Sequence, residues 1–347
     1  MTLADVCAGL IVIGLTAYTT LGGADFGGGI WDLTAGGPER GARLRGLVQS
    51  AMAPVWEANH VWLVFVLVMF WTAFSRAFGA VMSALYVPLF LAAVGVVLRG
   101  AAYALRGEAV TLSQQRILGA TFALSSLLTP FFLGAAIGAV ASGRVPVGGA
   151  AGGAFSAWTH PTSLVAGALA VAVGAHLAAV YLAGDASRMG LDDLRGAFRA
   201  RALGAGVVAG ALAVAGLVIV GSDAPRLSHG LTTGVGLACV LVSAAAGVAT
   251  LALVLAGRYD AARFGGALAV AGITIGWAVA QHPALLPGRL TVARAASPHA
   301  TLVALLASVG VGLVVVGPAL VTLYRMVLAG RLGEPFRPLG DTRRSPG

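Results

Sequence analysis

Long apolar stretches separated by short polar loops dominate the chain. A helix needs about 20 apolar residues to cross the hydrocarbon core of a bilayer, and nine stretches approach or exceed that length. The pattern therefore predicts an all-α polytopic membrane protein with about nine transmembrane helices. The predicted spans are residues 3–23, 53–74, 77–99, 117–142, 161–183, 202–221, 231–256, 265–281 and 299–328.

Composition supports a membrane location. Hydrophobic residues make up 58% of the chain and charged residues only 10%, against about 25% charged residues in soluble domains. No internal repeat or soluble domain boundary stands out, so residues 1–330 are expected to form a single transmembrane helical domain. Residues 331–347 are rich in Pro, Gly and Arg and are expected to be a disordered cytoplasmic tail.

The distribution of arginines predicts the orientation. All 22 basic residues are arginine; 17 follow the odd-numbered spans and 5 follow the even-numbered ones. Because positively charged loops stay in the cytoplasm, the N-terminus is expected outside and the C-terminus in the cytoplasm. The arginines are spread singly through the loops, so the net charge of +9 does not indicate nucleic-acid binding.

Polar residues interrupt the second span at its predicted cytoplasmic mouth. The stretch PVWEANHVWLVFVLVMFW places Glu57, Asn59 and His60 before a run of apolar residues. Asp25 and Arg99 are expected at the cytoplasmic ends of the first and third spans, and therefore at a similar depth. Ionisable groups inside membrane helices mark functional sites by default, so the cluster is a candidate proton entrance or subunit interface. The alternative is that charges near helix ends simply reach the lipid headgroups.

Other motifs carry less chemistry. The glycines around Asp25 lack the strand and the Gly-Lys-Ser/Thr of a phosphate loop and are better explained by close helix packing. Among the histidines, only His60 and His176 fall inside predicted spans. They could in principle bracket a haem, although histidines satisfied by neighbouring helices are more common. Cys7 and Cys239 lie in apolar segments and form no metal motif.

With these residues in view, the chain resembles subunit II of the cytochrome bd-type quinol oxidases. The resemblance covers most of the chain and is most specific in its first 110 residues. The version WEANHVW is similar to the cyanide-insensitive ubiquinol oxidase branch. The matching segments are GADFGGGIWDL (23–33), SAMAPVWEANHVWLV (50–64), SALYVPLFLAAVGVVLRGAAYALR (83–106) and TPFFLGAAIGAV (129–140), with weaker matches at 160–170 and 290–302.

The resemblance implies a haem-free integral subunit of a quinol:O2 oxidoreductase in the bacterial cytoplasmic (inner) membrane. It implies a partner, the haem-bearing subunit I with haem b and haem d, and leaves open a small accessory subunit and a bound quinone. Lipids and quinol are the other expected partners, and the chain itself would hold no complete active site and no metal. By the resemblance, Asp25 and Glu57 match the family's acids of a cytoplasmic proton path and Arg99 matches the arginine ending helix three. Glu57 stands where aspartate is usual.

The hypothesis for the site is that Glu57 and Asp25 relay protons, His60 and Asn59 extend the path, and Arg99 keeps the acids ionised. The rival hypothesis is a proton-coupled secondary transporter that uses the same acids. Transporters usually carry polar groups near the bilayer midplane, whereas the midplane of these spans is almost entirely apolar. A third hypothesis is a purely structural subunit whose charges serve only a contact with its partner.

Overall fold

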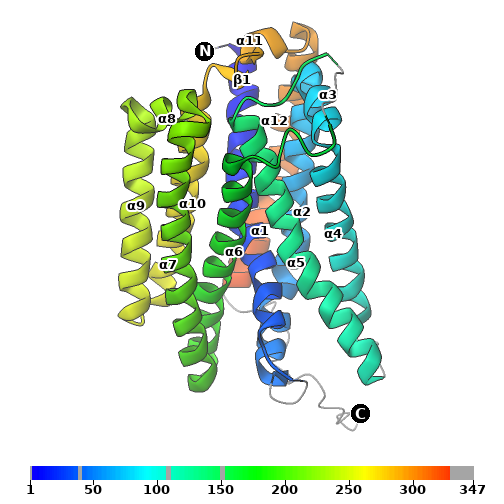
Figure 1. The fold of residues 1–347 in the computed structure, drawn as a ribbon. Coiled ribbons are helices and arrows are strands. Elements are labelled where there is room, and N and C mark those ends of the chain that lie inside the picture. Colours follow the sequence, from blue (N-terminus) through cyan, green and yellow to red (C-terminus); the bar gives the residue numbers. More distant parts are fainter. Residues whose placement is uncertain (1, 38–40, 107–110, 149–152, 329–347) are drawn as a thin grey trace.

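A computed structural model describes residues 2–37, 41–106, 111–148 and 153–328, except for the side chains of residues 52–58 and of a few residues elsewhere. The predicted all-helical architecture is confirmed, with one small β-hairpin in addition (Figure 1). In the hairpin the strands are antiparallel, with Ala284 opposite Thr291 and Leu286 opposite Leu290. The elements are α1 Leu3–Leu33, α2 Ala42–Ala73, α3 Ser75–Ala84, α4 Tyr86–Arg106, α5 Leu112–Ala141, α6 Pro161–Arg188, α7 Asp192–Asp223, α8 Pro225–Thr232, α9 Gly234–Leu255, α10 Tyr259–Gln281, β1 Ala284–Leu286, β2 Leu290–Thr291, α11 Val292–Ala295 and α12 His299–Leu328.

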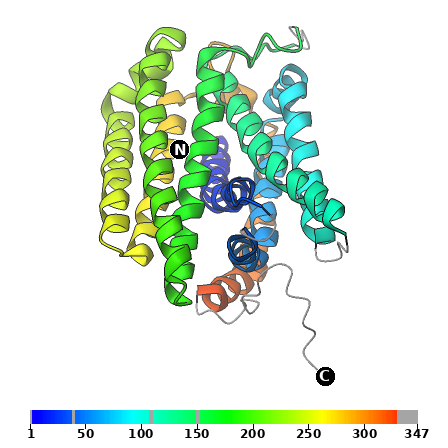
Figure 2. The ribbon, with the colours of Figure 1, turned by 60° about the horizontal axis from the view of Figure 1, so that its bottom comes forward.

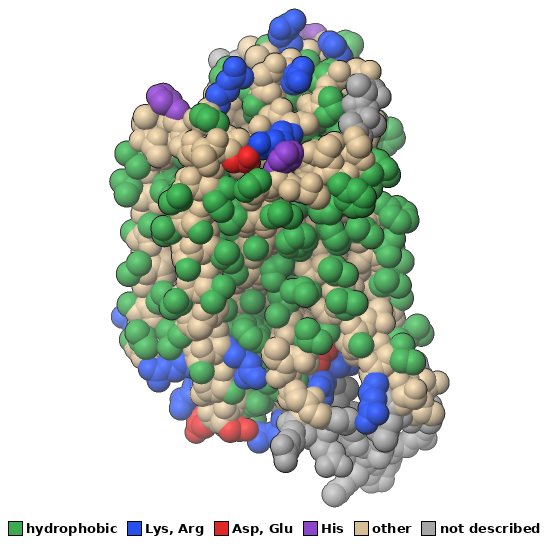
Figure 3. Space-filling view, viewed as in Figure 1, with side chains coloured by type: hydrophobic (Ala, Val, Ile, Leu, Met, Phe, Trp, Pro, Cys, Tyr) green, Lys and Arg blue, Asp and Glu red, His purple; other side chains and the backbone are tan. Residues whose placement is uncertain are grey.

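The number of membrane-spanning helices agrees with the prediction. Within the described ranges, eight helices are long and apolar enough to span a membrane, and a bent pair formed by α2 and α3 raises the number to nine. On the face shown in Figure 3, apolar side chains cover the middle of the molecule, while arginines and acids gather towards its two ends. The chain is thus a multi-pass membrane protein.

The predicted third span, residues 77–99, is wrong at its start. The chain bends by 117° between α2 and α3, so α3 forms a short separate helix and the span is α4. Phe74 at the bend has φ −136° and ψ 51°, outside the helical region. The predicted break between the second and third spans, at residues 75–76, lies beside this bend. The pattern missed the second break, between α3 and α4, because predominantly apolar residues continue from Ala77 into α4.

Several helices extend beyond their predicted apolar limits. Helix α1 continues to Leu33 and α4 to Arg106, so Asp25 and Arg99 each lie about two turns inside their helices. The expectation that both residues stand at helix ends is therefore wrong. Likewise Asp192–Arg201, which precedes the predicted span 202–221, is the first part of the continuous helix α7. The extended parts of α1 and α4 are stable because their charged side chains form buried ion pairs, as described below.

Local sequence explains where the helices begin and end. Thr2 and Asp5 form a capping box at the start of α1, in which each satisfies a backbone N–H that has no partner inside the helix. Pro161 occupies the first turn of α6, where its missing N–H is not needed. Gly190 follows α6 with a φ of +69°, a conformation that glycine adopts without strain.

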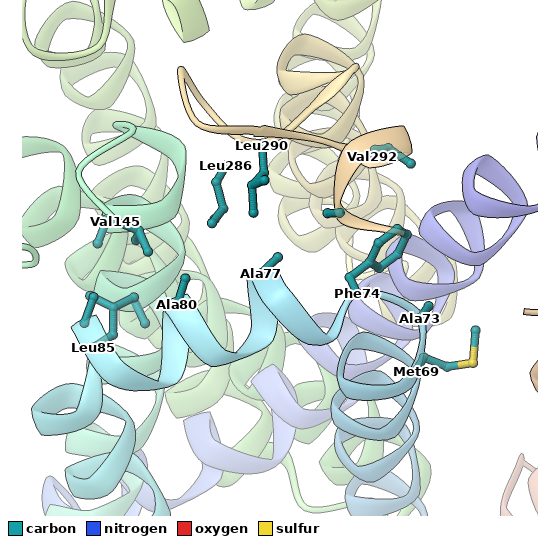
Figure 4. Packing of buried hydrophobic residues seen from close by; sticks show 14 of the residues in the cluster. Met69, Ala73, Phe74, Ala77, Ala80, Leu85, Val145, Leu286, Leu290 and Val292 are labelled. Atoms are coloured by element: carbon teal, nitrogen blue, oxygen red, sulfur yellow. The ribbon is translucent and has the colours of Figure 1, made fainter. Parts of the chain in front are cut away.

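Helix α1 occupies the centre of the bundle and packs against α2, α5, α6, α10 and α12 (Figure 2). We call the end of the molecule where α1 finishes the Asp32 end. The opposite end, where α1 begins and where α2 meets α3 at Phe74, is called the Phe74 end. At the Phe74 end, α3 turns its alanine face towards the hairpin and α11 (Figure 4). The cluster there includes Phe74, Leu85, Leu286 and Val292, and it closes that end of the bundle with apolar side chains.

Candidate functional site

Asp25 of α1 and Arg99 of α4 form a buried ion pair inside the bundle. The Nη1 and Nη2 atoms of Arg99 donate to the two carboxylate oxygens of Asp25 at 2.8 and 2.9 Å. Nη2 also donates to the backbone carbonyl of Asp25 at 2.9 Å. Both side chains are only 1% exposed, so the charges do not reach the headgroups. The pair was predicted to lie at a similar depth, and the structure brings it into direct contact.

The surroundings of Arg99 stabilise its charge away from water. Its Nε donates to Ser126 Oγ of α5 at 2.9 Å, so Nε, Nη1 and Nη2 all have partners. Its guanidinium also lies 4.9 Å from the ring centroid of Phe26 and 4.8 Å from that of Phe122, a favourable position for a cation over aromatic faces. A planar, bidentate contact of this kind is specific to arginine. The pair therefore joins α1, α4 and α5.

Glycines on α1 and α4 allow the helices to approach closely enough for these contacts. A Cβ on Gly27 would lie 2.0 Å from the carbonyl oxygen of Gly174 on α6. A Cβ on Gly29 would lie 2.1 Å from Ser126 Oγ, the atom that accepts from Arg99. Close helix packing, the preferred explanation of these glycines, is what the structure shows.

A second ion pair repeats the first at the Asp32 end. Asp32 accepts from Arg106 Nη1 at 2.6 Å and lies 2.8 Å from Arg45 Nε of α2. Asp32 stands seven residues after Asp25, and Arg106 stands seven residues after Arg99. On a helix this spacing is about two turns or 10 Å. The Asp32 side chain is only 2% exposed, so the second acid is also buried.

Sequence reasoning did not single out Asp32 or its two arginines. The signal was present as equal spacing: seven residues separate the two acids, and seven separate Arg99 from Arg106. Two parallel helices with equal spacing can form two pairs in the same register. Without knowing that α1 and α4 continue past their apolar limits, this signal could not be interpreted.

The remaining predicted site residues, Glu57, Asn59 and His60, all belong to α2. Asn59 of α2 is buried, and its Nδ2 donates to the carbonyl oxygen of Leu21 at 3.2 Å, one turn from Asp25. His60 is half-buried and also interacts with a neighbour. The backbone of Glu57 lies within α2, but its side chain is outside the described residues. The structure thus places Asn59 beside α1 near Asp25.

His176 belongs to a different contact. Its Nδ1 lies 2.9 Å from the carbonyl oxygen of Ala202 on α7, so this nitrogen carries the proton and donates it. A Cβ on Gly206 would lie 2.8 Å from the same nitrogen, so α7 packs directly on the ring and there is no room for a porphyrin on that side. Among the described side chains, no group of three or more His, Cys, Asp or Glu could hold a metal ion.

The arrangement offers two buried carboxylates in line along α1. Each is held by arginine. Both oxygens of Asp25 retain a second lone pair after accepting from Arg99, whereas Asp32 Oδ1 lies within 3.2 Å of nitrogens of both Arg45 and Arg106. Such groups can carry a proton or can simply bind helices together. Because the carboxylates are separated by about two turns, or 10 Å, any transfer between them needs intervening groups or water.

Comparisons with known proteins agree on one family. Residues 3–327 match the family model of cytochrome bd terminal oxidase subunit II. The cytochrome bd ubiquinol oxidase subunit 2 of Bacillus subtilis (strain 168) is 27% identical over 125 residues, which are 36% of this chain and 36% of that protein. The match thus spans about a third of that relative's length.

A solved structure supports the fold independently. The bd oxidase structure from Geobacillus thermodenitrificans contains a chain that superposes with a TM-score of 0.79 at 22% identity. The similarity covers 95% of this chain and 99% of that one. At this identity the match concerns the fold, whereas the family model covers nearly the whole sequence. The chain belongs to the cytochrome bd terminal oxidase subunit II family.

Proposed function

We propose that this chain is the haem-free membrane subunit of a bd-type quinol:O2 oxidoreductase in the bacterial cytoplasmic membrane. Family membership supports this assignment. In the proposal, a haem-bearing subunit I carries haem b and haem d and oxidises quinol, and the N-terminus of this chain lies outside. An accessory subunit and a quinone bound to this chain remain outside the proposal, since no observation supports either.

The proposed contribution of this chain is a path for protons from the cytoplasm. The observation that carries it is the in-line pair of buried acids, Asp32 at the predicted cytoplasmic end and Asp25 about two turns deeper. Ionisable groups are expensive at this depth and are usually retained for function. Glu57, His60 and Asn59 of α2 are proposed to extend the path, with Arg99 keeping Asp25 ionised between transfers.

A structural role is the second candidate, because Arg99 satisfies both oxygens of Asp25 and uses its Nε on Ser126. A buried pair of this kind could serve only to fix α1, α4 and α5. The two candidates differ in what a neutral side chain of equal shape would do. It would slow proton uptake if Asp25 carries protons, and would change only stability if Asp25 is structural. The transporter hypothesis has no comparable support, given the family.

Copurification tests the assignment to an oxidase. The full chain, tagged and extracted from its native membrane, is expected to arrive with a second large subunit and with haem b and haem d bands in a reduced-minus-oxidised spectrum. A chain that arrives alone and colourless would overturn the assignment. A haem spectrum that persists after the second subunit is removed would overturn the haem-free status.

A further inference from the structure

Three buried side-chain oxygens near the Asp25–Arg99 pair have no hydrogen-bond partner among the described residues. They are Tyr18 Oη of α1, Asn59 Oδ1 of α2 and Thr129 Oγ1 of α5. Their residues are 7%, 1% and 0% exposed, respectively, so neither solvent nor a docked subunit reaches these atoms directly. Buried polar atoms nearly always pair with protein or with ordered water.

All three oxygens belong to residues on the same side of the ion pair. Tyr18 precedes Asp25 by about two turns of α1, and its ring packs on Gly22, where a Cβ would lie 3.2 Å from the ring. Asn59 is anchored to the carbonyl of Leu21, one turn before Asp25. Thr129 lies against Gly95, one turn before Arg99 on α4. Since α1 and α4 run in the same direction, these residues lie towards the Phe74 end, away from Asp32.

Tyr18 and Asn59 also share a face of α1. Residues 18, 21, 22 and 25 follow the three-and-four spacing of one helix face, and that face carries the Tyr18 ring, the contact with Asn59 and the Asp25 carboxylate. The phenol of Tyr18 is within electrostatic range of both Asp25 and Arg99. A water held there would have several polar partners, which is the condition for stable burial.

We propose that Tyr18 and Asn59 hold ordered water directly beyond Asp25, and that this water takes the proton onward from Asp25 towards the Phe74 end. This inference rests on the proposed function and assigns Tyr18 to the path as a positioning residue. In the transfer, the O–H bond of the Asp25 carboxylic acid breaks as a water oxygen accepts that proton. The same water releases another proton to the next acceptor, and the Asp25 carboxylate is protonated again from the Asp32 side.

The test uses the assembled oxidase with Tyr18→Phe, Asn59→Leu and the double variant. Each single variant removes one partner of the water and is expected to slow proton uptake about fivefold to tenfold, the factor that corresponds to one lost hydrogen bond. The double variant is expected to be no slower than the slower single variant, because both act on the same water. Tyr259→Phe is the control, since Tyr259 is equally buried but lies at the start of α10.

Asp25→Asn in the same series separates the two levels of the proposal. If Tyr18→Phe and Asn59→Leu take up protons at the wild-type rate while Asp25→Asn does not, the water relay is wrong and the proposed function stands. If Asp25→Asn is also unimpaired, the proposed function fails. Should the variants not assemble, a cryo-EM map of the wild-type complex decides. Density for water within hydrogen-bond distance of both Tyr18 Oη and Asn59 Oδ1 supports the relay, and a map resolving other waters but none there overturns it.

Discussion

Arg99 holds Asp25 at three points, through both carboxylate oxygens and through the backbone carbonyl of the same residue. The contact therefore fixes the backbone of α1 as well as its side chain. It explains how two charges can lie about two turns inside their helices without reaching water. Because the same acid is proposed to carry protons, stability and proton transfer depend on one contact and must be measured separately.

Removing the arginine should destabilise the protein strongly. Arg99→Leu leaves the buried Asp25 carboxylate without its cation, a change that costs about 3–5 kcal/mol in buried pairs. Arg99→Lys keeps the charge but cannot make the bidentate contact, and we expect a smaller loss. Thermal unfolding of the purified complex measures both. Arg43→Gln is the matched control, because the Arg43–Asp193 pair is half-exposed on both sides and should contribute at most about 1 kcal/mol.

Helix packing at Gly27 gives a second prediction. Gly27→Ala would place a Cβ 2.0 Å from the carbonyl oxygen of Gly174, so α1 and α6 must move apart. Overpacking of this kind costs about 1–3 kcal/mol. Gly9→Ala on the same helix meets no atom within 4 Å and should leave the melting temperature unchanged or slightly higher, because alanine favours a helix more than glycine does. Equal melting temperatures for the two variants would show that α1 and α6 do not pack as described.

Asp32→Asn should destabilise the Asp32 end. Two arginines, Arg45 and Arg106, then share a neutral amide, and loss of the buried acid is expected to cost about 3 kcal/mol or more. Adding Arg45→Gln to Asp32→Asn should lower stability by less than the sum of the single effects, because the residues are in contact. Chemical or thermal unfolding of the four forms gives the coupling directly. Strict additivity would mean that the contact between Arg45 and Asp32 does not contribute.

Glu57 carries the prediction that depends most on the family resemblance. In the assembled oxidase, Glu57→Leu is expected to lower turnover and proton uptake by at least about a hundredfold, the lower end of the range for loss of an acid–base group. Glu57→Asp keeps a carboxyl group and should retain most of the activity. Stopped-flow proton uptake with a pH dye measures both variants. Unchanged uptake in Glu57→Leu would remove this residue from the path.

The apolar pattern predicted the helices well but not their polar ends. It located the eight long helices and the bent pair of the described ranges because lipid demands long apolar segments. It merged α3 with α4 because predominantly apolar residues continue from one helix into the next. It also ended α1 near residue 23, since it cannot see that Asp25, Asp32, Arg99 and Arg106 satisfy one another. Residue type and position predicted Asp25 and Arg99 at a similar depth but not their direct contact, whereas Asp32 required the register of two helices. Tyr18 required knowledge of which buried oxygens remain unpaired, which no sequence pattern contains.

The most direct test of the account is proton uptake by the assembled oxidase carrying Asp25→Asn, compared with Asp193→Asn. Both changes remove a carboxylate that is bonded to an arginine, but the Asp193 side chain is 56% exposed and lies outside the proposed path. Haem content and melting temperature confirm assembly of each variant. Asp25→Asn is expected to slow uptake by at least about a hundredfold, while Asp193→Asn is expected to take up protons like the wild type. Normal uptake by a fully assembled Asp25→Asn oxidase would contradict the account and would leave the buried pair a structural contact.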